Sequence, residues 1–373
     1  MNHKKLPLLE YAFELMDDVD FENTLIIASQ HILESIRTMF GYIIDKGANP
    51  IDIYLIGKCY SSNPMVLNRF KKMGINVSDK SMEFDSYVAF DEQFDILTRD
   101  FLEEVLKKVD LKKYRRVIIL EDGGGLLSHA NRVLNNFSNV VGIEQTSAGY
   151  EKLRNVKLKF PVINVARSKA KLVVESPIIA KTFLNKLQIS LKKIDKKPRN
   201  TLIVGSGAVG NAIYSQLKSN GANVFRYDVK NNISDFKDEG LGEILGKFDL
   251  IVGCTGKKII DLNFYKFLKK GAILASASSS DREFSAVDLR KLARKTKNCH
   301  KDIFVNDIYL INGGFPVNFD GGEISSPLDK IQITLSLLFA AVCIATSQTN
   351  KNGLVELDSK MQKKLIKKFE EFN

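Results

Sequence analysis

The chain is poor in the residues that hold metals and disulfides. Its 373 residues include only four cysteines and four histidines. Cys59, Cys254, Cys299 and Cys343 lie far apart with no C-x-x-C pair, and only His300 neighbours one of them. Disulfide frameworks and structural zinc sites rely on several such residues at short, regular spacings. The sequence therefore predicts neither a disulfide framework nor a metal site.

A membrane-spanning run and a secretory leader are also missing from the sequence pattern. No apolar run reaches the roughly 18 residues that a helix needs to cross a bilayer. The longest candidate, LSLLFAAVCIA at 335–345, reads as a buried helix, and the N-terminal stretch turns acidic too soon for a signal peptide. We therefore expect a cytoplasmic protein that does not associate with membranes.

The net charge of +11 has no nucleic-acid motif beside it. Pairs of lysines are spread along the whole chain, from 71–72 to 367–368, without a helix-turn-helix, zinc-finger or RNP pattern. Charge distributed in this way is typical of solvated faces. We expect no nucleic-acid partner.

The pattern that is present alternates short apolar runs with amphipathic stretches. Strand-like runs occur at 52–57, 115–120 and 160–165, and again at 248–256, 271–279 and 308–313. Helical patterns cover 64–73 and 177–194, and the tail places Met361, Leu365 and Phe369 on one helical face. Such alternation predicts an α/β protein with parallel sheets covered by helices on both faces.

The length fits two domains. We expect residues 1–180, completed by 340–373, to form an α/β substrate domain. A second, doubly wound α/β domain over 181–339 would be inserted into it. The helix predicted at 177–194 would connect the two.

The most informative stretch is TLIVGSGAVGNAIYSQLKSNGANVFRYD, residues 201–228. It combines a strand, a G-x-G-x-x-G turn formed by Gly205, Gly207 and Gly210, a helix, and a second strand that ends at Asp228. The first glycine permits the tight turn, the second lets a pyrophosphate approach the backbone, and the third lets helix and strand pack closely. Together with Val209 of the same turn, these residues predict a dinucleotide site at a helix N-terminus.

The acid at the end of the second strand bears on which dinucleotide binds. A carboxylate at Asp228 would accept the ribose hydroxyls of an adenosine moiety and repel a 2′-phosphate. This favours NAD as the cofactor, so the domain over 181–339 is expected to be a Rossmann-type NAD domain. Arg226, on the same face of the strand by alternation, leaves NADP open.

A series of segments in a fixed order carries a family resemblance. VIILEDGGGL (117–126), VGIEQTSAGYEKL (141–153) and FPVINVARSKAKLVVES (160–176) precede the glycine-rich turn, and IVGCTG (251–256), GAILASASSSDREF (271–284) and LINGG (310–314) follow it. In this order the chain resembles the S-adenosylhomocysteine hydrolases. The resemblance is strongest from about 115 to 315.

The resemblance implies an enzyme that holds NAD tightly and regenerates it in each cycle. In that family the substrate ribose is oxidised transiently at its 3′-hydroxyl, homocysteine is eliminated, water is added and the hydride returns. Carried over by motif, the catalytic residues fall on Asp122, Lys171 and Glu175. Lys171 and Glu175 stand four apart, so an ordinary i, i+4 surface ion pair is the alternative explanation.

The resemblance also implies cofactor contacts outside the glycine-rich turn. They fall on Thr146 and Ser147, on Thr255 and Gly256, and on Asn312. The second acid of the family's E-E-T-T-T-G motif is an amide here, Gln145.

Departures from the family pattern concern the substrate side. The histidine of the family's L-H-M-T motif has no counterpart in GKCYSSNP (57–64), another falls on Ser279, and a third is missing after Asn312. The C-terminal extension that closes over NAD in a neighbouring subunit is missing as well. Three histidines are therefore expected to be absent, and a homodimer or homotetramer would be weaker than in the family.

Three functions stay open at this point. The first is an NAD-dependent enzyme that oxidises a nucleoside- or sugar-like substrate transiently. The second is a regulatory homologue that binds NAD without turnover. The third is an ordinary dehydrogenase that exchanges NAD with solvent.

Overall fold

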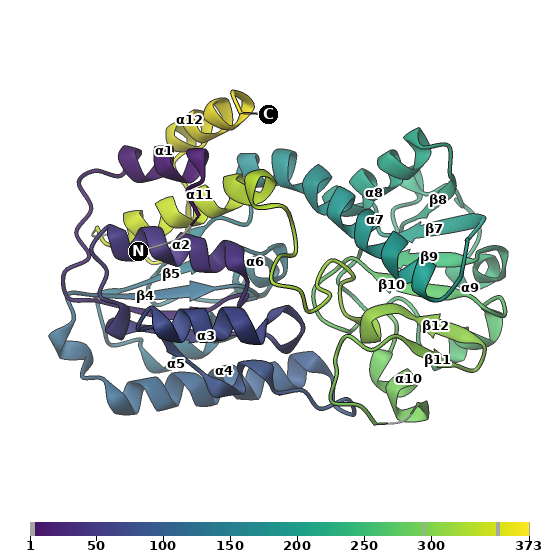
Figure 1. Ribbon diagram of the computed structural model, residues 1–373, viewed down its shortest axis with the longest axis horizontal. Helices are drawn as coiled ribbons and strands as arrows, with labels where there is room; N and C mark the ends of the chain where they lie inside the picture. Colours follow the sequence, from purple (N-terminus) through teal and green to yellow (C-terminus); the bar gives the residue numbers. More distant parts are fainter. Residues whose placement is uncertain (1–3, 294, 348–350, 373) are drawn as a thin grey trace. The chain divides into compact units, whose positions relative to one another are not determined.

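The computed structural model describes residues 4–293, 295–347 and 351–372. The chain forms two compact units (Figure 1). Unit 1 comprises residues 1–83, 94–175 and 327–373, and unit 2 comprises 84–93 and 176–326. The predicted fold class, an α/β protein with one α/β domain inserted in another, is confirmed by this division and by the two sheets.

Unit 1 is built on a parallel sheet of seven strands in the order β13-β6-β5-β4-β1-β2-β3. The strands are β1 (Thr24–Ser29), β2 (Ile53–Ile56), β3 (Asn76–Val77), β4 (Arg116–Glu121), β5 (Val140–Glu144), β6 (Pro161–Asn164) and β13 (Gly353–Glu356). The central strands β1, β4 and β5 are buried along their whole length. A sheet buried on both faces explains why these strands read as continuous apolar runs.

Helices cover both faces of this sheet (Figure 1). On one face, α4 (Phe90–Lys108) and α5 (Gly125–Val133) pack their apolar side chains against the strands. On the other, α11 (Leu328–Ala345) packs against β4, β5 and the helices α1 (Pro7–Leu15) and α2 (Glu34–Asp45). The remaining helices are α3 (Pro64–Lys72), α6 (Ser147–Leu153) and α12 (Ser359–Glu370).

The helix α11 contains the apolar run 335–345. It is long and apolar enough to cross a membrane, but 83% of its 18-residue span is buried inside the protein. The prediction of a buried helix is confirmed, and α11 is a core helix of unit 1. The face predicted for the tail helix is confirmed too, because Met361, Leu365 and Phe369 are the apolar residues that α12 buries.

Unit 2 is built on a six-stranded sheet in the order β11-β12-β10-β9-β7-β8, parallel except for the β11–β12 pair. Its strands are β7 (Asn200–Val204), β8 (Asn223–Tyr227), β9 (Leu250–Gly253), β10 (Ile273–Ser276), β11 (Ile303–Val305) and β12 (Ile308–Leu310). Its helices are α7 (Ser176–Lys193), α8 (Ala208–Ser219), α9 (Leu241–Ile244) and α10 (Ala286–Leu292). Two apolar clusters fill the two faces of the sheet, as a doubly wound fold requires.

The boundaries between the units differ from those predicted. Unit 1 resumes at Pro327 rather than 340, because α11 packs along its whole length in unit 1. The helix predicted at 177–194 is α7, which lies in unit 2 with Phe183 and Leu187 in its core. Boundaries drawn from composition cannot detect which sheet a helix covers.

The segment 84–93 was not expected in unit 2. The buried Arg290 donates from Nε to the carbonyl of Ser86 over 2.9 Å and forms an ion pair with Asp281. The carboxylate of Asp281 also accepts the backbone N–H of Phe90, at 3.2 Å. A buried Arg–Asp pair needs this full set of partners, and it ties the segment to unit 2.

Candidate functional site

The sheet of unit 1 reverses its strand order between β1 and β4. From β1 the chain proceeds outward to β2 and β3, whereas β4 leads in the opposite direction to β5 and β6. In open parallel sheets, ligands bind beyond the carboxyl ends of the strands at such a reversal. His31 follows β1 and Asp122 follows β4, so these two residues mark the reversal.

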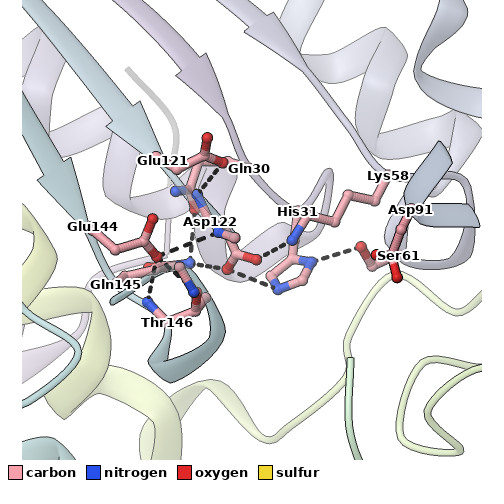
Figure 2. A network of polar contacts seen from close by, with 12 residues as sticks. Gln30, His31, Lys58, Ser61, Asp91, Glu121, Asp122, Glu144, Gln145 and Thr146 are labelled. Atoms are coloured by element: carbon pink, nitrogen blue, oxygen red, sulfur yellow. Dashed lines mark hydrogen bonds and ion pairs between the residues drawn. The ribbon is translucent and has the colours of Figure 1, made fainter. Parts of the chain in front are cut away.

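The carboxylate of Asp122 is the centre of a buried polar network (Figure 2). One of its oxygens, Oδ1, pairs with the ammonium of Lys58. The other, Oδ2, accepts from the side-chain amide of Gln145 and lies 3.3 Å from Nε2 of His31. The Nδ1 atom of His31 lies 2.6 Å from Oγ of Ser61. Residues from three strand ends therefore converge on one carboxylate.

The charges in this network stabilise one another. Burial alone would raise the pKa of Asp122, but the neighbouring Lys58 ammonium and His31 outweigh burial and hold the pKa well below its usual range. Burial would likewise lower the pKa of Lys58, yet the Asp122 carboxylate raises it. Both groups are therefore charged at neutral pH, as an ion pair isolated from water.

The loop that carries Asp122 is fixed by the preceding acid. Glu121 accepts the backbone N–H of Asp122 on Oε1 at 2.8 Å and that of Leu127 on Oε2 at 3.1 Å. Gly124 then takes a left-handed conformation, φ 77°, and caps α5. Both carboxylate oxygens of Glu121 thus position the turn from β4 into α5.

A second buried acid, Glu144, lies at the end of β5. Its Oε1 accepts from both the backbone N–H and the hydroxyl of Thr146 at 2.7 Å, whereas its Oε2 is buried without a hydrogen-bond partner. Burial, reinforced by the charge of Glu121, raises the pKa of Glu144 to about 8. Gly149 is required beside it, because a Cβ there would lie 2.2 Å from the carboxyl group.

The three residues predicted to be catalytic lie in unit 1, linked through Gln145. The side chain of Gln145 donates to Asp122, and its backbone carbonyl accepts from Nζ of Lys171 at 2.5 Å. Lys171 also lies 3.6 Å from Oε2 of Glu175, and both side chains are 15% exposed. The pair spans a π-helical turn, Lys171–Glu175, a local distortion often found at functional sites. Their catalytic role stays a prediction.

Two buried amides next to Asp122 have incomplete hydrogen bonding. Nε2 of Gln145 donates to Oε1 of Gln30 over 3.1 Å, but Nε2 of Gln30 and Oε1 of Gln145 have no partner. Both residues are at least nine-tenths buried. Because an unsatisfied buried polar atom is costly, a donor and an acceptor left free side by side indicate a place for a polar ligand.

A histidine beside Asp122 contradicts one expectation from the sequence. The resemblance placed the L-H-M-T motif at 57–64, where no histidine occurs. His31 instead follows an earlier strand, TLIIAS, which is β1. The apolar run followed directly by Gln30 and His31 was the available signal.

The glycine-rich turn of unit 2 has the geometry predicted for it. Gly205 follows β7 with φ 103°, and a Cβ on Gly210 would lie 2.0 Å from the carbonyl oxygen of Gly205. A Cβ on Gly207 would meet nothing within 4 Å. Gly207 caps α8, no side chain caps this helix N-terminus, and Val209 lies in its first turn. The backbone N–H groups there are available to an anion.

Asp228 lies beside this turn at the end of β8. Its Oδ2 accepts the backbone N–H of Ser206 at 2.7 Å, and its Oδ1 accepts that of Lys230 at 2.9 Å. Arg226 stacks its guanidinium 4.2 Å from the ring centre of Tyr214 on α8. The carboxylate is thus fixed next to the turn, while the arginine is held against the helix.

The remaining residues predicted to contact the cofactor already have internal partners. In unit 2, the backbone N–H groups of Thr255 and Gly256 donate to the buried Glu283, at 2.7 and 3.0 Å. Asn312 is left-handed, φ 51°; its amide donates to the carbonyl of Phe319 at 2.7 Å, and its Oδ1 lies 2.9 Å from Nδ1 of His300.

Thr146 and Ser147 lie in unit 1. Thr146 caps α6 by accepting the backbone N–H of Gly149 at 2.9 Å and donates its hydroxyl to Glu144, whereas Ser147 is exposed. The predicted cofactor residues are therefore divided between the units. Within residues 4–293, 295–347 and 351–372, no cluster of three or more His, Cys, Asp or Glu side chains is arranged to hold a metal ion.

The fold and the two strand-end clusters define a two-unit α/β protein in which unit 2 has a Rossmann-type fold. No protein-family model matches the chain. It belongs to the family of the uncharacterized proteins Rv0104 and MT0113 of Mycobacterium tuberculosis, with each of which it shares 36% identity over 350 residues, 91% of this chain and 69% of the relative.

More distant relatives have described activities. The chain is 27% identical over 221 residues to the S-inosyl-L-homocysteine hydrolase of Methanococcus maripaludis, covering 54% of this chain and 53% of that protein. It is 24% identical over 242 residues to the adenosylhomocysteinase of Sulfolobus acidocaldarius, covering 57% and 56%. These matches confirm distant homology to the adenosylhomocysteinases, over little more than half of their length.

Among solved structures, the chain is similar to the NAD+-bound 3-phosphoglycerate dehydrogenase of Entamoeba histolytica. The TM-score is 0.41 and the identity 11%, over 88% of this chain and 99% of that one. This similarity is too low to indicate a cofactor or a substrate.

Proposed function

We propose that this protein is an adenosylhomocysteinase-like enzyme that binds NAD on unit 2 and oxidises a nucleoside- or sugar-like substrate transiently at unit 1. The observation that carries the proposal is the network around Asp122. A buried carboxylate, a histidine and a lysine meet there beside the two unsatisfied atoms of Gln30 and Gln145. Such an arrangement would pair with substrate hydroxyl groups, which both donate and accept hydrogen bonds.

The glycine-rich turn of unit 2 fits an adenine dinucleotide. The empty space around Gly207 and the uncapped N-terminus of α8 suit a pyrophosphate, and Asp228 suits ribose hydroxyls. When bound, NAD supplies a hydride acceptor for the carbon that carries a substrate hydroxyl. Asp228 favours NAD over NADP, and Arg226, stacked on Tyr214, does not offset this preference.

The residues of unit 1 would hold the substrate and move protons. Oxidation of a hydroxyl group releases a proton that needs a base. We assign this role to Lys171, which is mostly shielded from water and paired with Glu175. The His31–Asp122 pair would serve as a second acid–base group, because histidine exchanges protons near neutral pH.

The distant relatives support the substrate class. An S-inosyl-L-homocysteine hydrolase and an adenosylhomocysteinase both act on nucleoside thioethers by their names. Gln145 replaces a family carboxylate with a neutral amide, so a somewhat different substrate is expected. A site built for one set of hydrogen bonds rejects ligands that leave them unpaired.

The test begins with the purified full chain. We expect denaturation to release NAD, and adenosine, inosine or their homocysteine thioethers to generate reduced nicotinamide absorbance that stays with the protein. Lys171→Ala should bind NAD and the substrate but produce no absorbance change. Lys181→Ala, a change of an exposed lysine in α7, is the matched control.

A second candidate, NAD binding without turnover, is favoured by one observation. Nζ of Lys171 is already engaged by Glu175 and by the backbone carbonyl of Gln145, as in a purely structural ion pair. Bound NAD that stays oxidised with every nucleoside, in wild type and Lys171→Ala alike, would select this candidate. Accumulation of free NADH with a simple alcohol would instead indicate an ordinary dehydrogenase. A cytoplasmic location and a homodimeric or homotetrameric state stay predictions.

A further inference from the structure

The partners of His31 determine where its hydrogen lies. Asp122 is ionised and can only accept hydrogen bonds, so Nε2 of His31, 3.3 Å from its Oδ2, carries the hydrogen. A neutral imidazole with hydrogen on Nε2 has a lone pair on Nδ1. Oγ of Ser61, 2.6 Å away, therefore donates its hydroxyl hydrogen to Nδ1. The two hydrogen bonds therefore run the same way: Ser61 donates to His31, and His31 donates to Asp122.

Lys58 anchors the far end of the chain of hydrogen bonds. It pairs with Oδ1 of Asp122, the oxygen that His31 and Gln145 do not use. Its side chain is 5% exposed, and the ammonium group lies close to Gly123, where a Cβ would be in ordinary contact at 3.6 Å from Nζ. The ammonium thus divides the carboxylate into one oxygen for the lysine and one for the histidine.

The charge balance around His31 depends on this lysine. The titratable groups that act on the Lys58–Asp122 pair beside it are Glu121 from the end of β4 and Tyr60 from the segment after β2, together with His31 itself. On α2, Glu34 is already paired with Arg37 and Arg69. A lone carboxylate would favour the imidazolium, whereas a carboxylate neutralised by an ammonium favours it less.

We propose that Lys58 is a positioning residue, which holds Asp122 as an ionised acceptor and so keeps His31 neutral, with hydrogen on Nε2 and Nδ1 facing Ser61. The proposal deepens the proposed function and rests on it for its catalytic meaning. His31 is then a base able to accept a proton at Nδ1, through the hydroxyl of Ser61, without first losing one.

The test follows the histidine signals of the full chain by NMR, with 15N-labelled imidazole and no ligand added. Only four histidines contribute signals. We expect wild-type His31 to show the Nε2–H tautomer near neutral pH. Lys58→Met should raise its titration midpoint by about one pH unit or more, the range for loss of a charge partner. Lys58→Arg keeps the cation and should resemble wild type.

Two controls make the outcome specific. Lys80→Met removes the exposed partner of Glu104 and should leave the His31 signals unchanged. If Lys58→Met fails to fold, the double variant Lys58→Met/Asp122→Asn removes both buried charges. A side-chain amide can donate as well as accept, so both His31 tautomers should then appear.

An unchanged midpoint and tautomer in folded Lys58→Met overturns the proposal, as does a single Nε2–H tautomer in the double variant. These outcomes are independent of turnover. If His31 responds as expected but nucleosides never reduce bound NAD, the proposed function fails and the positioning role stands. If both hold, Lys58→Met should shift the acid limb of the kcat/KM profile upward by the same amount as the His31 midpoint.

Discussion

The carboxyl ends of the two parallel sheets are constructed by different means. In unit 1, the strands β4 and β5 end in Glu121, Asp122 and Glu144, which are all buried and whose charges interact. In unit 2, the glycine-rich turn follows strand β7, and Glu283, a buried acid, accepts hydrogen bonds from N–H and hydroxyl donors. Unit 1 thus relies on side-chain charge, and unit 2 on backbone geometry.

This difference indicates which substitutions the carboxyl edge of each sheet can tolerate. Removing one charge in unit 1 leaves the oppositely charged partner buried without a counter-ion, whereas the backbone conformation there is unchanged. Adding one methyl group in unit 2 either brings two backbone segments into collision, at Gly210, or fills open space beside the turn, at Gly207, although no charge is altered. The two edges should therefore fail under different substitutions.

Neutralising the carboxylate of unit 1 should have the largest effect. Asp122→Asn leaves the ammonium of Lys58 buried without an anion, and breaking a buried pair in this way costs about 3–5 kcal/mol. Chemical unfolding should show this loss in the free energy of unfolding. Asp79→Asn, which breaks the exposed pair with Lys71, is the control and should have no measurable effect. Equal effects of the two substitutions would contradict the assignment.

The raised pKa of Glu144 in unit 1 predicts that the free energy of unfolding depends on pH. Its pKa is raised from 4.5 to about 8, so the folded state keeps a proton that the unfolded chain releases. The free energy of unfolding should therefore fall as pH rises from about 5 to 8, by at most about 1.4 kcal/mol per pH unit.

In the variant Glu144→Gln, the free energy of unfolding should fall less as the pH rises. The variant should therefore become more stable relative to wild type with increasing pH. The measurement is chemical unfolding at several pH values. The exposed acid Glu104, changed to Gln, serves as the control and should give a curve parallel to wild type. A Glu144→Gln curve that is also parallel would rule out the raised pKa.

A pair of substitutions in unit 2 separates cofactor binding from folding. Gly207→Ala meets no protein atom within 4 Å, so folding should be unchanged while NAD binds about tenfold more weakly, a loss of about 1.4 kcal/mol. Gly210→Ala collides with the backbone of Gly205 and should lower the unfolding midpoint itself. Titration calorimetry with NAD and denaturant unfolding measure the two effects. If Gly207→Ala binds NAD normally, the turn does not hold the pyrophosphate.

Much of the fold was predictable, because buried strands and amphipathic helices leave periodic patterns. The glycine-rich turn was predictable because the spacing of its glycines reflects local backbone geometry. Strand β13 and the place of residues 84–93 were missed, because both depend on partners distant in sequence: β13 pairs with β6, and Arg290 binds Ser86.

The site of unit 1 was only partly predictable. Asp122 and Lys171 were found through motif positions, but His31, Lys58 and Gln30 were not. They lie around Asp122 because β1 and β2 follow β4 in the order of the sheet, and this order cannot be read from any single segment of the sequence. A buried ion pair such as Lys58–Asp122 leaves no local signal at all.

Helix α11 and strand β13 of unit 1 follow unit 2 in the sequence, and this order constrains how unit 1 folds during synthesis. During synthesis, unit 2 leaves the ribosome before the helix that fills one face of unit 1. Until then α1 lacks its most extensive packing partner; in the finished protein, the backbone N–H of Leu8 donates to Gln332 over 3.0 Å. The first strands of unit 1 must therefore wait with one apolar face uncovered, a state that invites chaperone binding during translation.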